Sequence, residues 1–212
     1  MEAPEPRHTY DRIAEHFAAT REHPWPEVES FVADADPAAL ALDVGCGNGR
    51  HAEVLADVAD RVLGLDVSRG LLRTARDRRT DRGFAVDLLQ GDAARLPVRA
   101  DRVGLGVYVA ALHHLRPRER RIGSLDELAR VLAPGGRALV GVWSTTHDRF
   151  DATAGFDTTV DWTLPGGETL PRYYHVYDPT EFDEDLAASD LEPVDRFESS
   201  GNCYAVVGPP SR

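Results

Sequence analysis

The chain has 212 residues and a formal net charge of −12, from 24 basic and 36 acidic side chains. Hydrophobic residues make up 42% and charged residues 28%, an ordinary globular composition, and no apolar run approaches the about 18 residues of a membrane span. The two cysteines are too few for a disulfide scaffold and lack zinc-ligand spacing, so we expect a protein of the reducing cytoplasm with no metal site.

The charged residues are unusual in kind. Every basic residue is Arg, and Asp outnumbers Glu by 22 to 14. A strongly charged chain repels itself, but at about 1 M salt the Debye length falls to about 3 Å and screens that repulsion. The pattern predicts a halophilic, haloarchaeal source, and codon bias is the alternative that composition leaves open.

A helical arm is predicted at the N-terminus, over residues 1–35. Apolar side chains recur there at helical spacing, at Tyr10, Ile13, Ala14 and Phe17. The first helix ends at His23-Pro24-Trp25-Pro26, because a residue that precedes proline disfavours helical geometry. A second helix is expected from Glu27 to Ala35.

Strands and helices alternate through the middle of the chain. Strands are expected at residues 39–44, 61–66, 84–89, 102–108 and 137–143, and helices at residues 50–59, 69–79 and 118–132. This alternation predicts an α/β fold in which a parallel sheet has helices on both faces.

The last third of the chain changes character. Residues 144–171 are rich in Asp, Thr and Gly without a clear period, and we expect a long irregular stretch that serves function. A capped helix begins at Asp178, and two final strands over residues 193–198 and 202–207 form a hairpin. We expect a single domain over residues 1–212.

Three features at strand ends point to one ligand crevice. The turn Gly45-Cys46-Gly47-Asn48-Gly49 follows the first strand, and glycines let a backbone approach a ligand closely. Asp66 ends the second strand, where a carboxylate can accept both hydroxyls of a ribose. Asp92 follows the third strand, where it can accept an adenine amino proton.

The glycine spacing separates two classes of ligand. A dinucleotide site has the pattern G-x-G-x-x-G, whereas this chain has Gly45, Gly47 and Gly49 preceded by Asp43. An acid at that strand end repels a pyrophosphate and suits a cationic amino acid group. S-adenosylmethionine (SAM) carries such an ammonium and no phosphate, so SAM is the predicted cofactor.

These motifs resemble the class I SAM-dependent methyltransferases. The segments in question are Asp43 to Gly49, Asp66, Asp92 and Leu132 to Gly136. The resemblance implies a seven-stranded, mostly parallel, Rossmann-like sheet. It also implies a set of cofactor-binding residues, namely Asp43, Gly45, Cys46, Gly47, Asn48, Gly49, Asp66, Val67, Gly91, Asp92, Ala93 and Tyr108.

A narrower resemblance lies outside the SAM motifs. The chain is similar to the eukaryotic tRNA methyltransferases that esterify 5-carboxymethyluridine at the wobble position, together with a small zinc-binding activator subunit. The matching segments are His16 to Arg21 with Pro24 to Pro26, His113-His114 with Arg118 to Arg121, Trp143, Trp162 to Pro165, and Arg172 to Tyr177. Residues 144–177 then form a substrate-side insert, although residues 144–171 are much shorter than the eukaryotic counterpart.

The chemistry implied by this resemblance needs cations. A carboxymethyl group is ionised at neutral pH, so its oxygen can attack a sulfonium methyl without a general base, and catalysis rests on proximity. Arg21 and Arg172 are the candidate cations, because Arg binds carboxylates in bidentate fashion. The candidate site residues are Arg21, His113, His114, Trp143, Arg172, Tyr173, Tyr174 and His175, with the aromatic residues and Trp25 available to stack a base.

Purely structural roles remain open for several of these residues. His113 and His114 can cap a helix, Trp143 and Tyr174 can belong to the core, and Arg21 can pair with Glu15 or Glu22. The enzyme class is also open at this point. A small-molecule methyltransferase and a non-catalytic SAM-binding partner of an assembly are the alternatives.

Two partners are expected and a membrane is not. Arginines that can contact tRNA near the anticodon loop form two clusters, at residues 69–82 and 116–121, and the second is preferred because it adjoins His113 and His114. Strand 84–89 is an expected sheet edge, which can accept a strand of the activator subunit.

Overall fold

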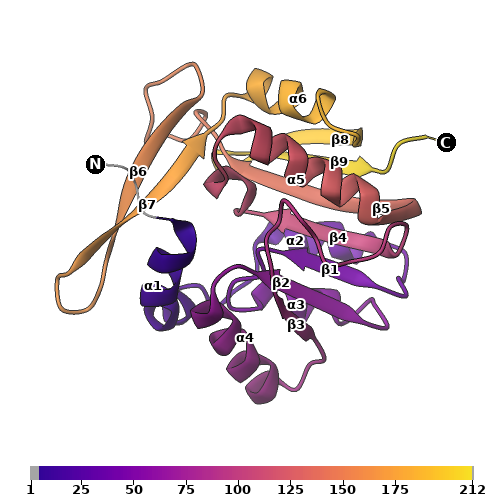
Figure 1. The fold of residues 1–212 in the computed structure, drawn as a ribbon, viewed down its shortest axis with the longest axis horizontal. Coiled ribbons are helices and arrows are strands. Elements are labelled where there is room, and N and C mark those ends of the chain that lie inside the picture. Colours follow the sequence, from indigo (N-terminus) through magenta and orange to yellow (C-terminus); the bar gives the residue numbers. More distant parts are fainter. Residues whose placement is uncertain (1–4, 212) are drawn as a thin grey trace.

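A seven-stranded sheet crosses the middle of the molecule in this computed structural model, which describes residues 5–211 (Figure 1). Residues 1–4 of the predicted arm lie outside the described residues. The strand order is β3-β2-β1-β4-β5-β9-β8, and the first five strands are parallel while β9 runs antiparallel to both neighbours. The strands are β1 (Ala41–Val44), β2 (Val62–Asp66), β3 (Asp87–Gln90), β4 (Val103–Val109), β5 (Leu132–Trp143), β8 (Glu192–Ser199) and β9 (Asn202–Gly208).

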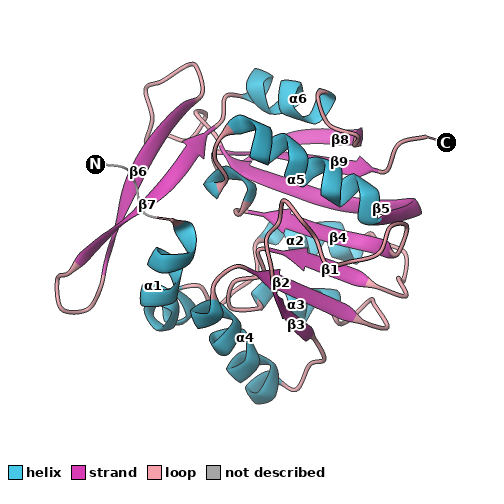
Figure 2. Cartoon of the chain, in the orientation of Figure 1, coloured by secondary structure: helices cyan, strands magenta, loops and turns pink. Residues whose placement is uncertain are grey.

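Helices cover both faces of this sheet, which confirms the predicted α/β class (Figure 2). Helices α5 and α6 lie over one face, and α2 and α3 lie over the other. Two apolar clusters fill the two interfaces, one around Leu125 and Leu186 and the other around Val28 and Leu55. The helices are α1 (Pro6–Thr20), α2 (Pro26–Ala33), α3 (Arg50–Leu55), α4 (Arg69–Arg82), a short 3-10 helix η1 (Leu112–His114), α5 (Arg118–Val131) and α6 (Pro179–Ala187).

Residues 156–171 of the stretch predicted to be irregular instead belong to a β-hairpin, so that expectation was wrong for them, whereas residues 144–155 contain no helix or named strand. Strands β6 (Phe156–Thr163) and β7 (Thr169–Val176) pair antiparallel and project from the body of the molecule (Figure 1). Exposure alternates along β6, with Asp157 and Asp161 outward and Trp162 inward. Because Asp and Thr occupy so many positions of β6, the period of two is difficult to see in its hydropathy.

Helix α1 packs between this hairpin and α4. Ile13 forms an apolar cluster with Trp162 and Leu170 of the hairpin. On its other side α1 crosses α4 at Gly70, where an added Cβ would lie 2.8 Å from the Asp11 carbonyl oxygen and 3.0 Å from the Ala14 Cβ. The arm is therefore fixed from two sides.

Several element bounds differ from the predicted ones. Strand β3 begins at Asp87 rather than at residue 84, because Gly83 ends α4 in the left-handed conformation and Phe84 and Val86 pack into the core beneath α3. Its place at the edge of the sheet is as predicted. Strand β5 starts at Leu132, directly after α5, and so includes residues 133–136, which lie between the predicted helix and the predicted strand.

The predictions for the C-terminal part hold closely. Asp178 caps α6, since its carboxylate accepts hydrogen bonds from the N–H groups of Thr180 and Glu181. Strands β8 and β9 form the expected hairpin. Across residues 5–211, none of the helices combines the length and the apolarity that a bilayer crossing requires.

Candidate active site

A cavity of about 430 Å³ opens at the carboxyl ends of strands β1, β2 and β4. Helix α1 forms one of its walls through Pro6, Tyr10 and Phe17. The end of β4 and the start of α5 form another. Of the predicted cofactor residues, those that line this cavity are Gly45, Gly47, Asp66, Val67, Gly91, Asp92 and Ala93.

The glycine-rich turn forms the floor of the cavity. Gly45 and Gly47 have φ angles of 71° and 55°, a left-handed conformation that side chains rarely adopt, and a Cβ on Gly45 would overlap the Ala111 side chain. The Gly47 N–H donates a 2.9 Å hydrogen bond to Asp66 Oδ2. The turn therefore leaves room for a ligand and is tied to the acid at the end of β2.

Asp66 is buried, with 7% of its surface exposed, yet it faces the cavity. Its other oxygen accepts a 2.8 Å hydrogen bond from the Ser68 N–H. Burial raises the pKa of this carboxyl to about 6. Each carboxylate oxygen accepts one backbone hydrogen bond and keeps a second lone pair, so the group can still accept the hydroxyls of a ribose.

Asp43 lies behind the turn rather than in the cavity wall, and only 1% of it is exposed. Burial, followed by the nearby charge of Asp66, raises the pKa of the Asp43 carboxyl to about 7. Its Oδ2 atom has no hydrogen-bond partner among residues 5–211. A carboxylate oxygen without a hydrogen-bond partner, beneath the glycine-rich turn, suits a cationic ligand. SAM is such a ligand.

The remaining predicted cofactor residues do not face the cavity. Asn48 donates to the Arg21 carbonyl at 2.8 Å, Gly49 packs on Ala75, and Cys46 is buried against Gly64. Tyr108 is fully buried, and its hydroxyl shares a 2.7 Å hydrogen bond with Ser124 of α5. The prediction for Tyr108 is corrected, because its position on β4 directs the side chain into the core on the α5 face.

Asp92 lines the cavity but is already engaged. Its Oδ1 accepts from the Ala94 N–H at 3.0 Å, and its Oδ2 accepts from Arg120 at 2.6 Å. Arg120 and its neighbour Arg116 also line the cavity. An adenine amino group would therefore share this carboxylate with Arg120.

A cluster of polar and aromatic side chains adjoins the cavity on the hairpin side. The Tyr10 hydroxyl donates to His114 Nε2 at 2.9 Å, and His114 Nδ1 donates to the Tyr173 carbonyl at 2.7 Å. One ring nitrogen thus accepts while the other donates, which is the neutral imidazole, and burial lowers the pKa of His114 to about 4. Tyr10 and His114 both line the cavity.

The two predicted cations converge on one indole. The Arg172 guanidinium lies 4.7 Å from the Trp162 ring centroid and 5.2 Å from that of Tyr174, and Arg21 lies 5.4 Å from Trp162. Arg172 Nη1 donates to the Tyr174 hydroxyl at 2.6 Å. Its Nε atom is buried and has no partner in the described part of the chain. This unpaired donor is available to an anion.

His113 and Trp143 lie behind this cluster. His113 Nδ1 accepts from the Trp143 backbone N–H at 3.1 Å, and its ring centroid is 5.0 Å from that of Tyr174. Burial, with a smaller contribution from His114, holds the pKa of His113 well below its ordinary value. Trp143 is half-buried and packs on Tyr174 and Phe150, at 5.2 and 4.7 Å between centroids. Trp25 instead packs on His51 and Tyr204 beneath α3.

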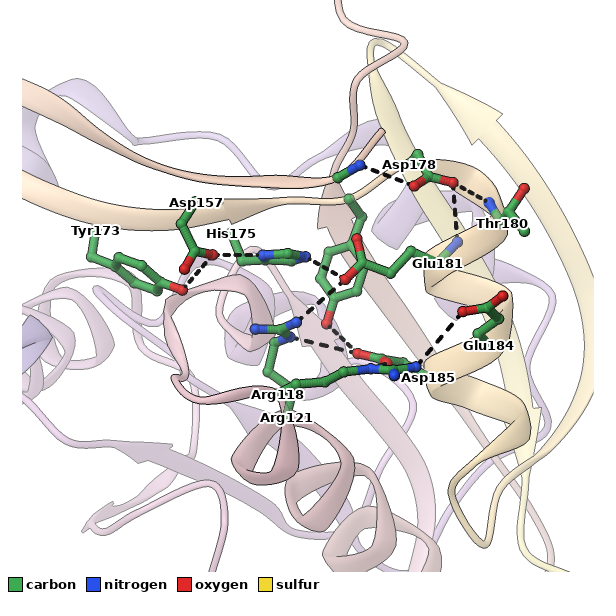
Figure 3. A network of polar contacts seen from close by, with 12 residues as sticks. Arg118, Arg121, Asp157, Tyr173, His175, Asp178, Thr180, Glu181, Glu184 and Asp185 are labelled. Carbon is green, nitrogen blue, oxygen red and sulfur yellow. Dashed lines mark hydrogen bonds and ion pairs between the residues drawn. The ribbon is translucent and has the colours of Figure 1, made fainter. Parts of the chain in front are cut away.

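Tyr173 and His175 face away from this cluster, which corrects their prediction as acceptor-side residues. The Tyr173 hydroxyl donates to Asp157, and His175 lies between Asp157 and Glu181 (Figure 3). Successive side chains of a strand point to opposite faces, so Arg172 and Tyr174 share one face of β7 while Tyr173 and His175 share the other. Recognising β7 as a strand would have separated the two pairs.

Both arginine clusters contain cations with internal partners. Arg118 and Arg121 pair with Asp185, and Arg120 pairs with Asp92, so these cations have internal partners. In the other cluster, Arg78 and Arg82 pair with acids. Its other exposed members are Arg69, Arg73 and Arg76.

Known proteins that are similar to this chain in sequence are methyltransferases. A family model described as "Methyltransferase domain" matches residues 42–140. The tRNA (carboxymethyluridine(34)-5-O)-methyltransferase alkbh8 of Xenopus tropicalis is 40% identical over 139 residues, which is 66% of this chain and 21% of that protein. The protein with the same enzyme name in Schizosaccharomyces pombe is 28% identical over 198 residues, covering 82% of this chain and 83% of that protein. The match spans about a fifth of the length of the alkbh8 relatives from Xenopus tropicalis, Mus musculus and Macaca fascicularis.

Solved structures share the fold over the whole chain. The CcbJ methyltransferase from Streptomyces caelestis matches with a TM-score of 0.78 and 20% identity, covering all of both chains. A chain of the complex between the Haloferax volcanii Trm112 methyltransferase activator and a methyltransferase matches with a TM-score of 0.71 and 18% identity, covering 98% of each chain. At these identities the likeness shows the fold alone.

Proposed function

We propose that this protein methylates tRNA. The proposal proceeds from two findings: residues 42–140 match the methyltransferase domain family, and the chain has the fold of the SAM-dependent methyltransferases. The acceptor is the carboxylate of a 5-carboxymethyl group on the wobble uridine, and the product is its methyl ester. The printed names of the relatives from Xenopus tropicalis and Schizosaccharomyces pombe support this choice of substrate.

The observation that carries the proposal is the position of Arg172. Its guanidinium keeps a buried, unpartnered Nε beside Tyr10 and His114, which line the cavity over the glycine turn. A planar guanidinium donates two parallel hydrogen bonds to a carboxylate, which fixes both its position and its orientation. An acceptor anion bound by Arg172 would therefore be adjacent to the cofactor pocket.

The residues present suit a transfer that moves no proton. SAM, when bound, supplies a methyl group on a cationic sulfur. Arg172 and Arg21 neutralise the acceptor carboxylate and hold one oxygen toward the cavity. Burial keeps His114 neutral by lowering its pKa to about 4, and its one free ring nitrogen already accepts a hydrogen bond from Tyr10, so it does not act as a base here. Orientation by these fixed groups accounts for the rate, as expected when reactants are held in line.

A small zinc-binding activator subunit is part of the same proposal. Strand β3 is an edge of the sheet, and Leu88 and Leu89 are half-buried there. An added strand can pair along it by β-augmentation. The likeness to a chain from a Trm112 activator complex supports this partner. Exposed Arg69, Arg73 and Arg76 on α4 provide local cations for the phosphates of tRNA.

The test is methyl transfer from SAM labelled in its methyl group to tRNA that carries the carboxymethyl group, with and without the activator subunit. The expected product loses its label as volatile methanol after mild alkali, because a methyl ester hydrolyses while methyl groups on carbon or nitrogen do not. Transfer to unmodified tRNA should fail. Label found in alkali-stable nucleosides, or only in the small-molecule fraction, would contradict the proposal.

A further inference from the structure

Two arginines beside the cofactor cavity have no acidic partner. Arg21 follows the last turn of α1, and Arg172 lies on β7 with its side chain half-buried. Within the described range 5–211 neither forms an ion pair, so the pairing of Arg21 with Glu15 or Glu22 that the sequence left open is not made. A partly buried cation loses hydration and needs another source of stabilisation.

The indole of Trp162 stabilises both arginines. The register of the hairpin pairs Trp162 with Leu170, so Arg172 is its diagonal neighbour on the same face, a separation of about 7–8 Å that long and aromatic side chains can bridge. The guanidinium carbon of Arg172 lies over the indole at 4.7 Å from its centroid, and that of Arg21 at 5.4 Å. The negative face of an indole attracts cations.

The indole is itself held at the junction of α1 and the hairpin (Figure 1). Trp162 is 7% exposed and packs with Ile13 and Leu170 in one apolar cluster. Its Nε1 atom donates a 3.1 Å hydrogen bond to His16 Nδ1 on α1. One arginine therefore comes from the same helix as this acceptor and the other from the same hairpin as the indole, so the ring fixes both relative to one another.

An aromatic ring in this place has a different effect from an acidic side chain. A carboxylate would hold the guanidinium groups, but it would neutralise them and occupy the N–H donors that a substrate carboxylate needs. The ring face stabilises the charge and leaves it in place. Arg172 donates Nη1 to the Tyr174 hydroxyl and keeps a buried Nε without a partner in the described part of the chain. Its charge and at least this donor remain available.

We propose that Trp162 is a positioning residue, which holds Arg21 and Arg172 together as one carboxylate-binding pair without neutralising either. The identity of the carboxylate rests on the proposed function. The arrangement of the arginines around the indole does not, and it can be measured in the protein without substrate.

The first measurement is exchange of the Arg172 Nε proton with water, followed by NMR and assigned by its absence in Arg172→Lys. This proton is buried in the native chain, so its exchange should be slow. Trp162→Leu keeps an apolar side chain but removes the ring, and exchange should become at least about tenfold faster. Leu170→Ala weakens the same apolar cluster and keeps the ring, so it is the control and should exchange as the native chain does.

The second measurement uses fluorinated tryptophans placed at position 162 alone. Each added fluorine withdraws electron density from the ring face, while the shape of the ring and its N–H donor are nearly unchanged, so these proteins should fold even where Trp162→Leu does not. The readout is the ratio of two Kd values, for anticodon stem-loops that carry either 5-carboxymethyluridine or its neutral amide. The native chain should prefer the carboxylate. That preference should fall stepwise with fluorination, by about tenfold in all, as for loss of a desolvated cation–π contact.

A role in packing alone predicts different results. It predicts equal exchange rates in Trp162→Leu and Leu170→Ala and a preference that is independent of fluorination, and either result overturns the role of Trp162. A native chain that binds both stem-loops equally contradicts the proposed acceptor, and the exchange measurement then still decides whether Trp162 holds Arg172.

Discussion

Asp11 on α1 caps the N-terminus of α4. One of its carboxylate oxygens, Oδ1, accepts hydrogen bonds from the Ser68 hydroxyl and from the Gly70 N–H, both at 2.8 Å. The Ser68 N–H in turn donates to Asp66, which lines the cofactor cavity. The N-terminal arm is thereby joined to the cofactor site through two consecutive hydrogen bonds.

Replacing Asp11 with Ala should weaken this arrangement. We expect the free energy of unfolding to fall by about 1 kcal/mol, as for loss of a helix cap, and SAM affinity to fall because Ser68 and Asp66 lose a constraint. Denaturant unfolding and calorimetry measure the two effects. Glu15→Ala, on an exposed face of α1, is the control. Equal behaviour of the two variants would contradict the role of Asp11.

Gly70→Ala tests the crossing of α1 and α4. The added Cβ would meet the Asp11 backbone and the Ala14 side chain, and overpacking of this kind costs about 1–3 kcal/mol. Limited proteolysis should cleave the arm faster, and cofactor binding should weaken. Gly123→Ala in α5 is matched, since it is also a helical glycine but has no atom within 4 Å of the added Cβ, and it should leave stability equal or raised.

Arg172→Ala should separate binding of the two substrates. Truncating one member of a buried charged pair costs about 2–5 kcal/mol, so kcat/KM for tRNA should fall at least about thirtyfold. SAM affinity should be unchanged, because Arg172 is outside the cavity lining. Arg172→Lys should recover part of the loss. Transfer at the native rate in the Ala variant would remove Arg172 from the site.

The pH dependence of stability should reflect Asp43. Its folded pKa is about 7 and its ordinary value is 3.8, so between these values the folded state holds a proton that the unfolded state has released. Stability attributable to this group is therefore greatest in acid and declines as pH rises from about 4 to about 7. Asp43→Asn should flatten this decline in thermal unfolding.

SAM binding should show the opposite dependence on Asp43. A cationic ligand prefers the ionised carboxylate, so affinity should increase as pH rises through about 7 in the native chain. In Asp43→Asn the affinity should be lower and independent of pH over that range. A variant that keeps the native pH dependence would assign it to another group, such as Asp66.

Salt should stabilise this protein. The net charge of −12 produces self-repulsion that about 1 M KCl screens, so the Tm should rise between low salt and molar salt. Sorbitol of equal osmolality is the control for solvent effects unrelated to charge. A Tm that falls as KCl is added would contradict the halophilic interpretation of the composition.

The strand ends were the most predictable part of this molecule. Gly47, Asp66 and Asp92 were placed at the cavity because parallel strands bring their carboxyl ends to one edge of the sheet, and a local pattern suffices to locate them. The cap at Asp178 was predictable for the same reason, since it depends on residues within one helical turn.

The parts that escaped prediction depend on distant contacts. Tyr10 was assigned only to a helix face, because its hydrogen bond to His114 spans a long separation in sequence. The pairing of Asp157 with His175 requires the register of a hairpin whose strands carry polar residues. Tyr108 was assigned to the cofactor by resemblance, whereas packing against α5 decides where its ring lies.

The edge strand β3 has only four residues, Asp87–Gln90, and its inner side already pairs with β2. A chain that adds to it can gain only about four main-chain hydrogen bonds, since alternate groups point outward. So few main-chain hydrogen bonds are too weak to hold a stable complex together. Most of the binding free energy of a stable complex at this edge must therefore come from side chains on either side of the paired strands, including Leu88 and Leu89.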